Sequence, residues 1–175
     1  MFAITERLLL RPGWAEDAAD LARAIDSEKV IRNLAVVPWP YRLADAEAFL
    51  ALPCEVKRPR FLITRRADGT LVGGIGLHGK HEAELGYWIA PEYWGQGYAT
   101  EAGRAVIALA DDSLRLPRVT AGHALDNPNS GKVLAKLGFR PGGIVPRFSA
   151  GRGTEMQVRL FCRERPSAAS QPLAA

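Results

Sequence analysis

Residues 91–102 read PEYWGQGYATEA and join a predicted strand directly to a predicted helix. Gly95 and Gly97 let the backbone turn tightly and bring its N–H groups close to a ligand, because glycine has no Cβ to block the approach. At the start of a helix these groups add to a macrodipole of roughly half a positive charge, which favours an anion. The stretch therefore predicts a phosphate or pyrophosphate site. A turn without a ligand is the plain alternative for two glycines.

Two common nucleotide sites do not match this stretch. A nucleoside-triphosphate loop ends in Gly-Lys-Ser/Thr, which is not found here. A dinucleotide-binding fold has its glycine-rich turn after the first strand, whereas this turn follows the fourth predicted strand. The sequence therefore favours another kind of phosphate-bearing ligand.

The segments around the turn predict a β-α-β unit. AELGYWIA, residues 83–90, is typical of a strand, and RVTAGHAL, residues 118–125, of another. Between them Ala99, Ala102 and Val106 recur at helical spacing, in a helix that ends near Asp112. Such a unit predicts two parallel neighbouring strands joined by a right-handed crossover.

The rest of the chain alternates between strands and helices. Asn127-Pro128 is typical of an N-cap and first helical position, and Gly138 of a helix end. Asp68-Gly69 between two β-capable runs indicates a hairpin. The remaining predicted elements are strands within 2–11, 61–66, 71–79, 139–147 and 155–163, and helices around 18–25 and over 43–52. They indicate an α/β fold with a mixed sheet flanked by helices.

Composition indicates one ordinary globular domain. The chain has 175 residues, with 47% hydrophobic and 24% charged residues. We expect the domain to span residues 1–165 and the Pro/Ala/Ser-rich residues 166–175 to be a disordered tail. No apolar run approaches the roughly 20 residues of a bilayer span, and no signal-peptide pattern is present, so we expect a cytoplasmic protein that does not bind membranes.

Charge and cysteine content narrow the ligand classes. The net charge of +4 comes from basic residues that are spread out, which favours an anionic ligand weakly and makes direct nucleic-acid binding unexpected. Cys54 and Cys162 are too few for a disulfide framework and have no zinc-like spacing. His78, His81 and His123 have no carboxylate at metal spacing and no serine triad pattern, so we expect no metal site and strand-end or solvent-facing histidines.

Three separated segments resemble the GCN5-related N-acetyltransferases (GNAT), and more narrowly their RimJ/RimL-like branch. They are TERLLLRP (residues 5–12), GYWIAPEYWGQGYATEA (86–102) and NPNSGKVLAKLGF (127–139). The resemblance covers nearly the whole domain. It implies a mostly antiparallel mixed sheet of about seven strands with about four helices and a parallel β-α-β cofactor-binding unit.

By this resemblance the glycine turn binds the pyrophosphate of acetyl-CoA. The family pattern is Gln/Arg-x-x-Gly-x-Gly/Ala; Gly97 and Ala99 match its last two positions, whereas Trp94 departs from its first. The pantetheine arm would pair with the backbone of residues 88–90. The implied cofactor-binding residues are Trp88, Ile89, Ala90, Trp94, Gly95, Gln96, Gly97, Tyr98, Ala99, Thr100, Asn127 and Lys132. The alternative for Asn127 is that it serves only as the N-cap of its helix. The alternative for Lys132 and Lys136 is that they are solvated charges on the helix surface.

Acetyl transfer to an amine requires a neutral amine and a proton for the departing thiolate. A lysine near pKa ~10.4 costs about 4.6 kcal/mol to deprotonate at pH 7, whereas an α-amine near ~7.8 is already partly neutral. Glu84 is the first candidate base, through a water, with Glu82 in reserve; an ion-paired or surface glutamate is the alternative. Ser130 matches the branch's Asn-x-x-Ser motif and is the candidate proton donor, or simply a first-turn residue.

The predicted activity is therefore N-acetylation of a primary amine by direct attack in a ternary complex. The alternative is a non-catalytic domain that binds an acyl-CoA as a sensor. Trp39, Tyr41 and Tyr87 are candidates for the acceptor pocket, although aromatic residues at such spacing usually belong to a core. The acceptor stays open between protein N-termini and small-molecule amines, and the assembly between a monomer and a homodimer.

Overall fold

The computed structural model describes residues 1–79 and 81–166. The expected disordered tail, apart from Pro166, therefore lies outside the described residues. The strands are β1 (Ala3–Ile4), β2 (Leu8–Arg11), β3 (Arg60–Arg65), β4 (Leu71–His78), β5 (Ala83–Ile89), β6 (Arg118–Ala124), β7 (Arg140–Ser149) and β8 (Thr154–Glu164). The helices are α1 (Ala18–Ile25), α2 (Glu28–Ile31), α3 (Leu43–Ala51), α4 (Tyr98–Ala108), which a wide turn over Leu109–Ser113 continues, and α5 (Pro128–Lys136).

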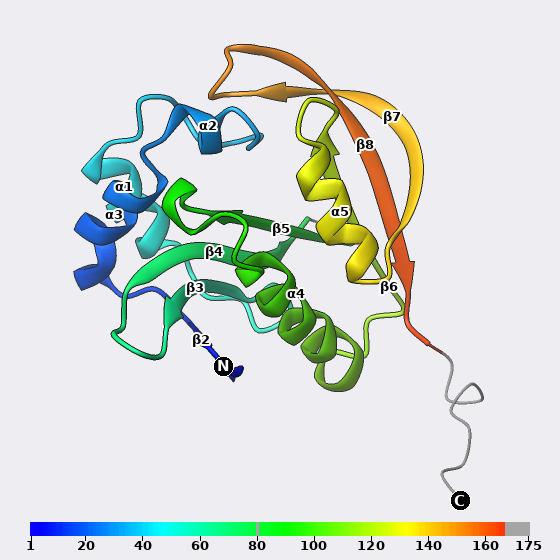
Figure 1. Cartoon of the computed structure of the whole chain (residues 1–175), viewed down its shortest axis with the longest axis horizontal. Coiled ribbons are helices and arrows are strands. Elements are labelled where there is room, and N and C mark those ends of the chain that lie inside the picture. The colour runs from blue at the N-terminus through cyan, green and yellow to red at the C-terminus, as the bar shows by residue number, and fades with distance from the viewer. Residues whose placement is uncertain (80, 167–175) are drawn as a thin grey trace, which may run out of the picture.

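The strands form one mixed sheet in the order β1-β2-β3-β4-β5-β6-β8-β7. Within the described ranges, β5 and β6 are the parallel pair and the other neighbours are antiparallel. The expected fold class is confirmed, including the parallel β-α-β unit. The sheet has one strand more than the approximate count, because residues 2–11 form the short β1 as well as β2 (Figure 1).

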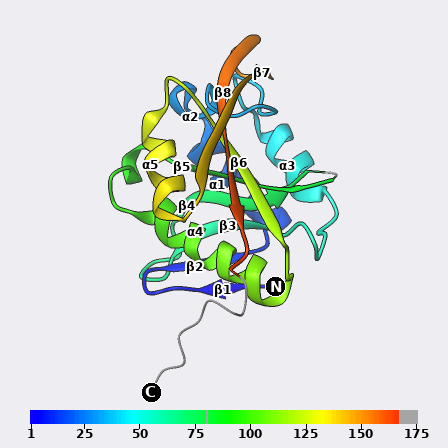
Figure 2. The same ribbon diagram turned by 90° about the vertical axis from the view of Figure 1, so that its right-hand side faces the viewer.

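Each face of the sheet is covered by its own helices. On one face, α4 and α5 bury a core that includes Ile75, Leu85, Val106 and Leu134. On the other, α1 and its neighbours pack against Leu62, with Ala18, Leu21 and Ile25 facing inward as their helical spacing predicts. Figure 2, turned by 90°, shows α5 and α3 on opposite sides of the strands. The fold is thus a sheet between two helical layers.

The parallel pair separates partway along its length. β5 and β6 are paired only from Ala83 to Leu85 on β5, which face Val119 to Ala121 on β6. Beyond that point β5 stays with β4 as far as Ile89, while β6 stays with β8 as far as Ala124. The two strands therefore open into a V-shaped gap in the middle of the sheet, and α4 and α5 begin beside it.

The N-terminal segment is tied to the start of α4 by Glu101. Its carboxylate accepts hydrogen bonds from Thr5 Oγ1 at 2.6 Å and from the Arg7 backbone N–H at 2.9 Å. The Arg7 guanidinium pairs with the same carboxylate at 2.6 Å and also donates to the Gln96 carbonyl at 3.0 Å. Burial raises the pKa of Glu101, but these hydrogen bonds outweigh it, so that the pKa lies below its usual value.

We expect Glu101→Gln to lower the free energy of unfolding by about 1–3 kcal/mol at pH 7, because hydrogen bonds to a charged group are lost. Since the folded-state pKa of Glu101 is lowered, its contribution is present above the unfolded pKa and is lost as pH falls through the folded value. Urea unfolding at several pH values checks this, with the exposed Asp20–Arg23 pair as the control through Asp20→Asn. A gap between wild type and variant that stays constant down to pH 3 would contradict it.

No helix in the described part of the chain has the length and apolar character needed to cross a membrane.

Candidate active site

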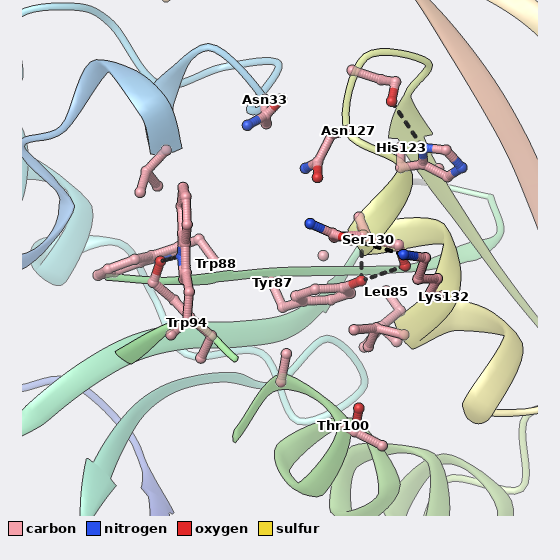
Figure 3. Close-up of a pocket in the computed structure, with 18 of the residues that line it drawn as sticks. Asn33, Leu85, Tyr87, Trp88, Trp94, Thr100, His123, Asn127, Ser130 and Lys132 are labelled. Atoms are coloured by element: carbon pink, nitrogen blue, oxygen red, sulfur yellow. Dashed lines mark hydrogen bonds between the residues drawn. The ribbon is translucent and has the colours of Figure 1, made fainter. Parts of the chain in front are cut away.

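The V-shaped gap opens into a pocket of about 520 Å³. Its walls come from β5, the turn before α4, β6, the first turns of α5, the segment after α2, and the β7–β8 hairpin. Figure 3 shows Tyr87, Ser130 and Lys132 on one side of this pocket and Trp88 and Trp94 on the other, with Thr100 below. Two of the three segments that carry the family resemblance, 86–102 and 127–139, therefore meet at a single cavity.

The turn before α4 presents free backbone N–H groups to this pocket. Gly95 and Gly97 adopt left-handed conformations with φ of 77° and 82°, which L side chains rarely adopt. From Gly95 onward, Glu101 is the first residue whose N–H donates to a preceding carbonyl, that of Gly97 at 3.0 Å. Among the described residues, the amides from 95 to 100 have no backbone acceptor. Gly95, Gly97, Tyr98, Ala99 and Thr100 line the pocket, so these amides stay available for an anion.

Trp94, the departure from the family pattern, has a specific structural role. Its indole Nε1 donates to the Ile89 carbonyl at 2.6 Å. This bond connects the turn to the end of β5, at a position where β5 is no longer paired with β6. The side chain thus fixes the turn in place, while the backbone supplies the free N–H groups.

Ser130 and Tyr87 form a hydroxyl pair at the point where α5 faces β5. Their oxygens are 2.7 Å apart, and the Tyr87 hydroxyl also lies 3.1 Å from the Ser130 carbonyl (Figure 3). Burial raises the pKa of Tyr87 to about 12, against a smaller opposing effect of the hydrogen bond with Ser130. Tyr87 therefore stays protonated at neutral pH, and the pair can hold a proton at the pocket surface.

The residues at the start of α5 also face the cavity. Asn127 is at the N-cap position, as predicted, but its side chain makes no capping hydrogen bond. It lines the pocket instead, so the stabilising cap suggested by the sequence is wrong. Lys132 and Lys136 line the pocket from the same helix. His123 is fixed between Phe161, 5.4 Å away between ring centroids, and Gly131, where a Cβ would lie 2.7 Å from its Nε2.

Glu84 reaches the pocket as a member of an ion pair. Arg147 on β7 contacts both of its carboxylate oxygens, at 2.5 Å and 3.2 Å. His78 Nε2 lies 4.0 Å from the same carboxylate. Gly122 and Gly86 permit this convergence, because a Cβ at the first would approach Val158 and Arg147, and one at the second would lie 2.9 Å from His78. Glu82 is mostly exposed, 3.7 Å from Arg118, and is not a lining residue.

Some predicted site residues lie elsewhere. Trp39 is exposed and Tyr41 is buried in the core of α1–α3, and neither lines the pocket. Ala90 is fully buried and Gln96 faces away, its carbonyl held by Arg7. Trp88 lines the pocket by lying over Gly74, where a Cβ would be 2.6 Å from its indole Nε1.

The lining residues that the sequence did not indicate include Arg147 and Asn33. Arg147 is the last residue of the predicted strand 139–147, and the residue pattern of that strand does not show that its side chain contacts Glu84 on β5. Asn33 lies in the segment after α2, where no sequence pattern distinguishes it from its neighbours. Across residues 1–79 and 81–166, no three His, Cys, Asp or Glu side chains gather as metal ligands would.

Comparisons with known proteins all identify acetyltransferases as similar to this chain. The sequence pattern of the Acetyltransferase (GNAT) domain matches residues 7–140. The uncharacterized N-acetyltransferase YoaA of Bacillus subtilis is 31% identical, covering 95% of this chain and 99% of its own. The structure of Mycobacterium smegmatis RimJ in complex with CoA-disulfide has a TM-score of 0.78 at 25% identity, covering 95% of this chain and 85% of that one. A putative ribosomal-protein-serine acetyltransferase from Vibrio cholerae has a TM-score of 0.77 at 25% identity, covering 94% and 97%.

Proposed function

Since the chain belongs to the GNAT acetyltransferase family and is an acetyl-CoA-dependent N-acetyltransferase, we propose that it acetylates a primary amine by direct attack in a ternary complex. The acceptor is a protein N-terminus or a small-molecule amine. The nitrogen bonds to the acetyl carbon as the carbon–sulfur bond breaks, the nitrogen loses a proton, and the thiolate gains one. Acetyl-CoA supplies the activated acetyl group, and the residues of the pocket bind, orient and move protons.

The free amides before α4 carry this proposal. A diphosphate has several anionic oxygens and suits successive N–H groups at a helix N-terminus, where the helix dipole adds to the hydrogen bonds. The left-handed Gly95 and Gly97 turn these groups outward, and Lys132 and Lys136 add positive charge on the facing helix. The donor set therefore fits the phosphates of coenzyme A. Beyond Leu85, β6 no longer pairs with β5, and this edge of β5, up to the Ile89 carbonyl that Trp94 occupies, suits an extended pantetheine arm that adds to it as a strand does.

Ser130 is proposed to protonate the thiolate, with Tyr87 as its partner. The 2.7 Å contact lets the phenol replace the proton that the serine gives up. The raised pKa of Tyr87 supports this role, because a hydroxyl that stays protonated can act as a donor. The pair lies beside the gap where the arm would end.

Glu84 is proposed to receive the amine's proton through a water. The two contacts from the Arg147 guanidinium hold its carboxylate in place at the pocket wall. A weak base is sufficient, because an amine nitrogen becomes strongly acidic once it bonds to a carbonyl carbon. An α-amine near pKa ~7.8 is already partly neutral at pH 7. The arrangement thus suits an α-amine better than a lysine.

Purified protein incubated with acetyl-CoA and a panel of amines tests the activity. The panel contains peptides with free N-termini, the same peptides with blocked N-termini and an internal lysine, aminoglycosides and polyamines. We expect thiol release above background with at least one amine, and mass spectrometry should show a single added acetyl group. Calorimetric binding of acetyl-CoA without turnover on any amine would instead support the sensor alternative.

We expect the pH profile to report the acceptor rather than the hydroxyl pair. With an α-amine acceptor, kcat/KM should rise to about pH 8, because the neutral amine is the nucleophile. It should then stay level to at least pH 10, since the pKa of Tyr87 is about 12. Initial rates at constant ionic strength check this. A fall in kcat/KM between pH 8 and pH 10 would contradict the assignment of a protonated Tyr87.

A further inference from the structure

The β7–β8 hairpin closes one end of the pocket by contacting the segment after α2. Figure 1 shows the tip of the hairpin extending toward α2. The buried Ser149 hydroxyl donates to the Leu34 carbonyl at 2.9 Å, and Ala150 N–H to the Ala35 carbonyl at 2.8 Å. A Cβ at Gly151 would lie 2.4 Å from Ile31 Cγ2, so the tip approaches as closely as a glycine allows.

An ionic bridge joins the same two segments to the loop before α5. Arg152 at the hairpin tip donates to both carboxylate oxygens of Asp126, at 2.9 Å and 2.8 Å. Its Nε donates to the Arg32 carbonyl at 2.5 Å, and the Arg32 guanidinium contacts Asp126 at 3.1 Å. Hydrogen bonding from Arg152, aided by its charge and that of Arg32, lowers the pKa of Asp126 despite partial burial. The bridge therefore stays ionic at neutral pH.

Each end of this bridge directly precedes an asparagine that lines the pocket. Asn33 follows Arg32, and Asn127 follows Asp126. Figure 3 shows both side chains at the end of the cavity away from Thr100 and α4. Asn33 Nδ2 donates to the Lys29 carbonyl at 2.8 Å. Among the described residues no donor reaches its Oδ1, which leaves that oxygen to accept an N–H group in the pocket.

We propose that Asn33 contacts the acceptor amine through Oδ1, and that Arg32, Asp126 and Arg152 position it there. The inference rests on the proposed function, since it names a residue of the same pocket. An amine or ammonium has N–H donors and suits an amide oxygen whose orientation is already fixed. Arg32, Asp126 and Arg152 act as positioning residues, because they hold the backbone on either side of the cavity mouth.

The test measures acetyl-CoA affinity and acceptor KM separately, with the amine from the panel that the wild type acetylates fastest. For Asn33→Ala we expect an unchanged acetyl-CoA Kd and an acceptor KM raised roughly three- to tenfold, the value of one hydrogen bond. For Asp126→Ala we expect a rise of roughly two- to fivefold, as for a partly exposed ion pair. Asp111→Ala is the matched control, because Asp111 forms an equivalent two-point pair with Arg163, at 2.8 Å and 2.7 Å, outside the pocket.

A second variant separates binding from local structure. Asn33→Asp keeps an oxygen for the amine, although it cannot donate to the Lys29 carbonyl, and we expect its KM to stay near that of the wild type. Equal losses in Asn33→Ala and Asn33→Asp would overturn the inference and assign Asn33 a structural role only. A wild-type KM in Asn33→Ala would also overturn it while leaving the activity intact. Absence of turnover by the wild type would reject the proposed function first, and this inference with it.

Discussion

Removing both hydroxyls of the Ser130–Tyr87 pair is expected to lower kcat roughly 100- to 1000-fold, within the usual contribution of general acid catalysis. The acetyl-CoA Kd of the Ser130→Ala/Tyr87→Phe double variant should stay within about threefold of the wild type, because neither hydroxyl is among the phosphate-binding amides. Stopped-flow thiol release and calorimetry measure the two quantities. The reason for the lower kcat is that, in the double variant, no positioned hydroxyl can protonate the departing thiolate.

The single variants distinguish a shared proton donor from two independent groups. The oxygens are 2.7 Å apart, so either hydroxyl can take over part of the role of the other. We therefore expect each single variant to lose roughly 10- to 100-fold and the double variant to lose less than the product of the two. Thr64→Val removes a buried hydroxyl bonded to Leu9 far from the pocket and is the control. A double variant whose kcat falls less than threefold would exclude this pair as the proton source.

The predictable part of the fold is the part set by local sequence. The glycine turn, the helix after it and the hairpin at Asp68-Gly69 each depend on residues close together in the chain, so spacing and turn chemistry were sufficient. Gly138, which ends α5 with φ of 83°, is of the same kind. The parallel pairing of β5 and β6 followed from the helix between them, because a crossover of that length brings the second strand back beside the first.

The site was less predictable because its contacts join distant parts of the chain. Tyr87 and Ser130 are 43 residues apart, and Glu84 and Arg147 are 63 apart. Sequence indicated three of these residues one by one but could not show that they pair. The opening between β5 and β6 has no local signal either, since it depends on where β6 diverges from β5 while it stays paired with β8. Asn127 shows the opposite error. Its local sequence predicts a capping hydrogen bond, but its side chain makes none and lines the pocket.

Gly97→Val is expected to weaken acetyl-CoA binding roughly 100-fold, through backbone strain and misdirected amides. A β-branched residue is a severe outlier at φ of 82°, and holding a residue in such a region costs about 1–3 kcal/mol. The variant can relieve this strain by leaving the left-handed region, which rotates the neighbouring N–H groups away from the phosphates and loses hydrogen bonds to a charged ligand. In the bound state the variant therefore either keeps the strain or loses these hydrogen bonds, and either cost corresponds to a weakening of up to roughly 100-fold in Kd.

Gly69→Val provides the matched control, since Gly69 has a similar φ of 74° and no atom within 4 Å of the place that a Cβ would take, but lies in the β3–β4 turn. Thermal unfolding should show similar losses of stability in the two variants, whereas calorimetry should show weakened acetyl-CoA binding in Gly97→Val alone. Equal Kd values for the two variants would mean that the turn before α4 does not hold the diphosphate. That result would remove the main support for the proposed binding mode, because the free amides are the feature that identifies this end of the pocket as the cofactor's.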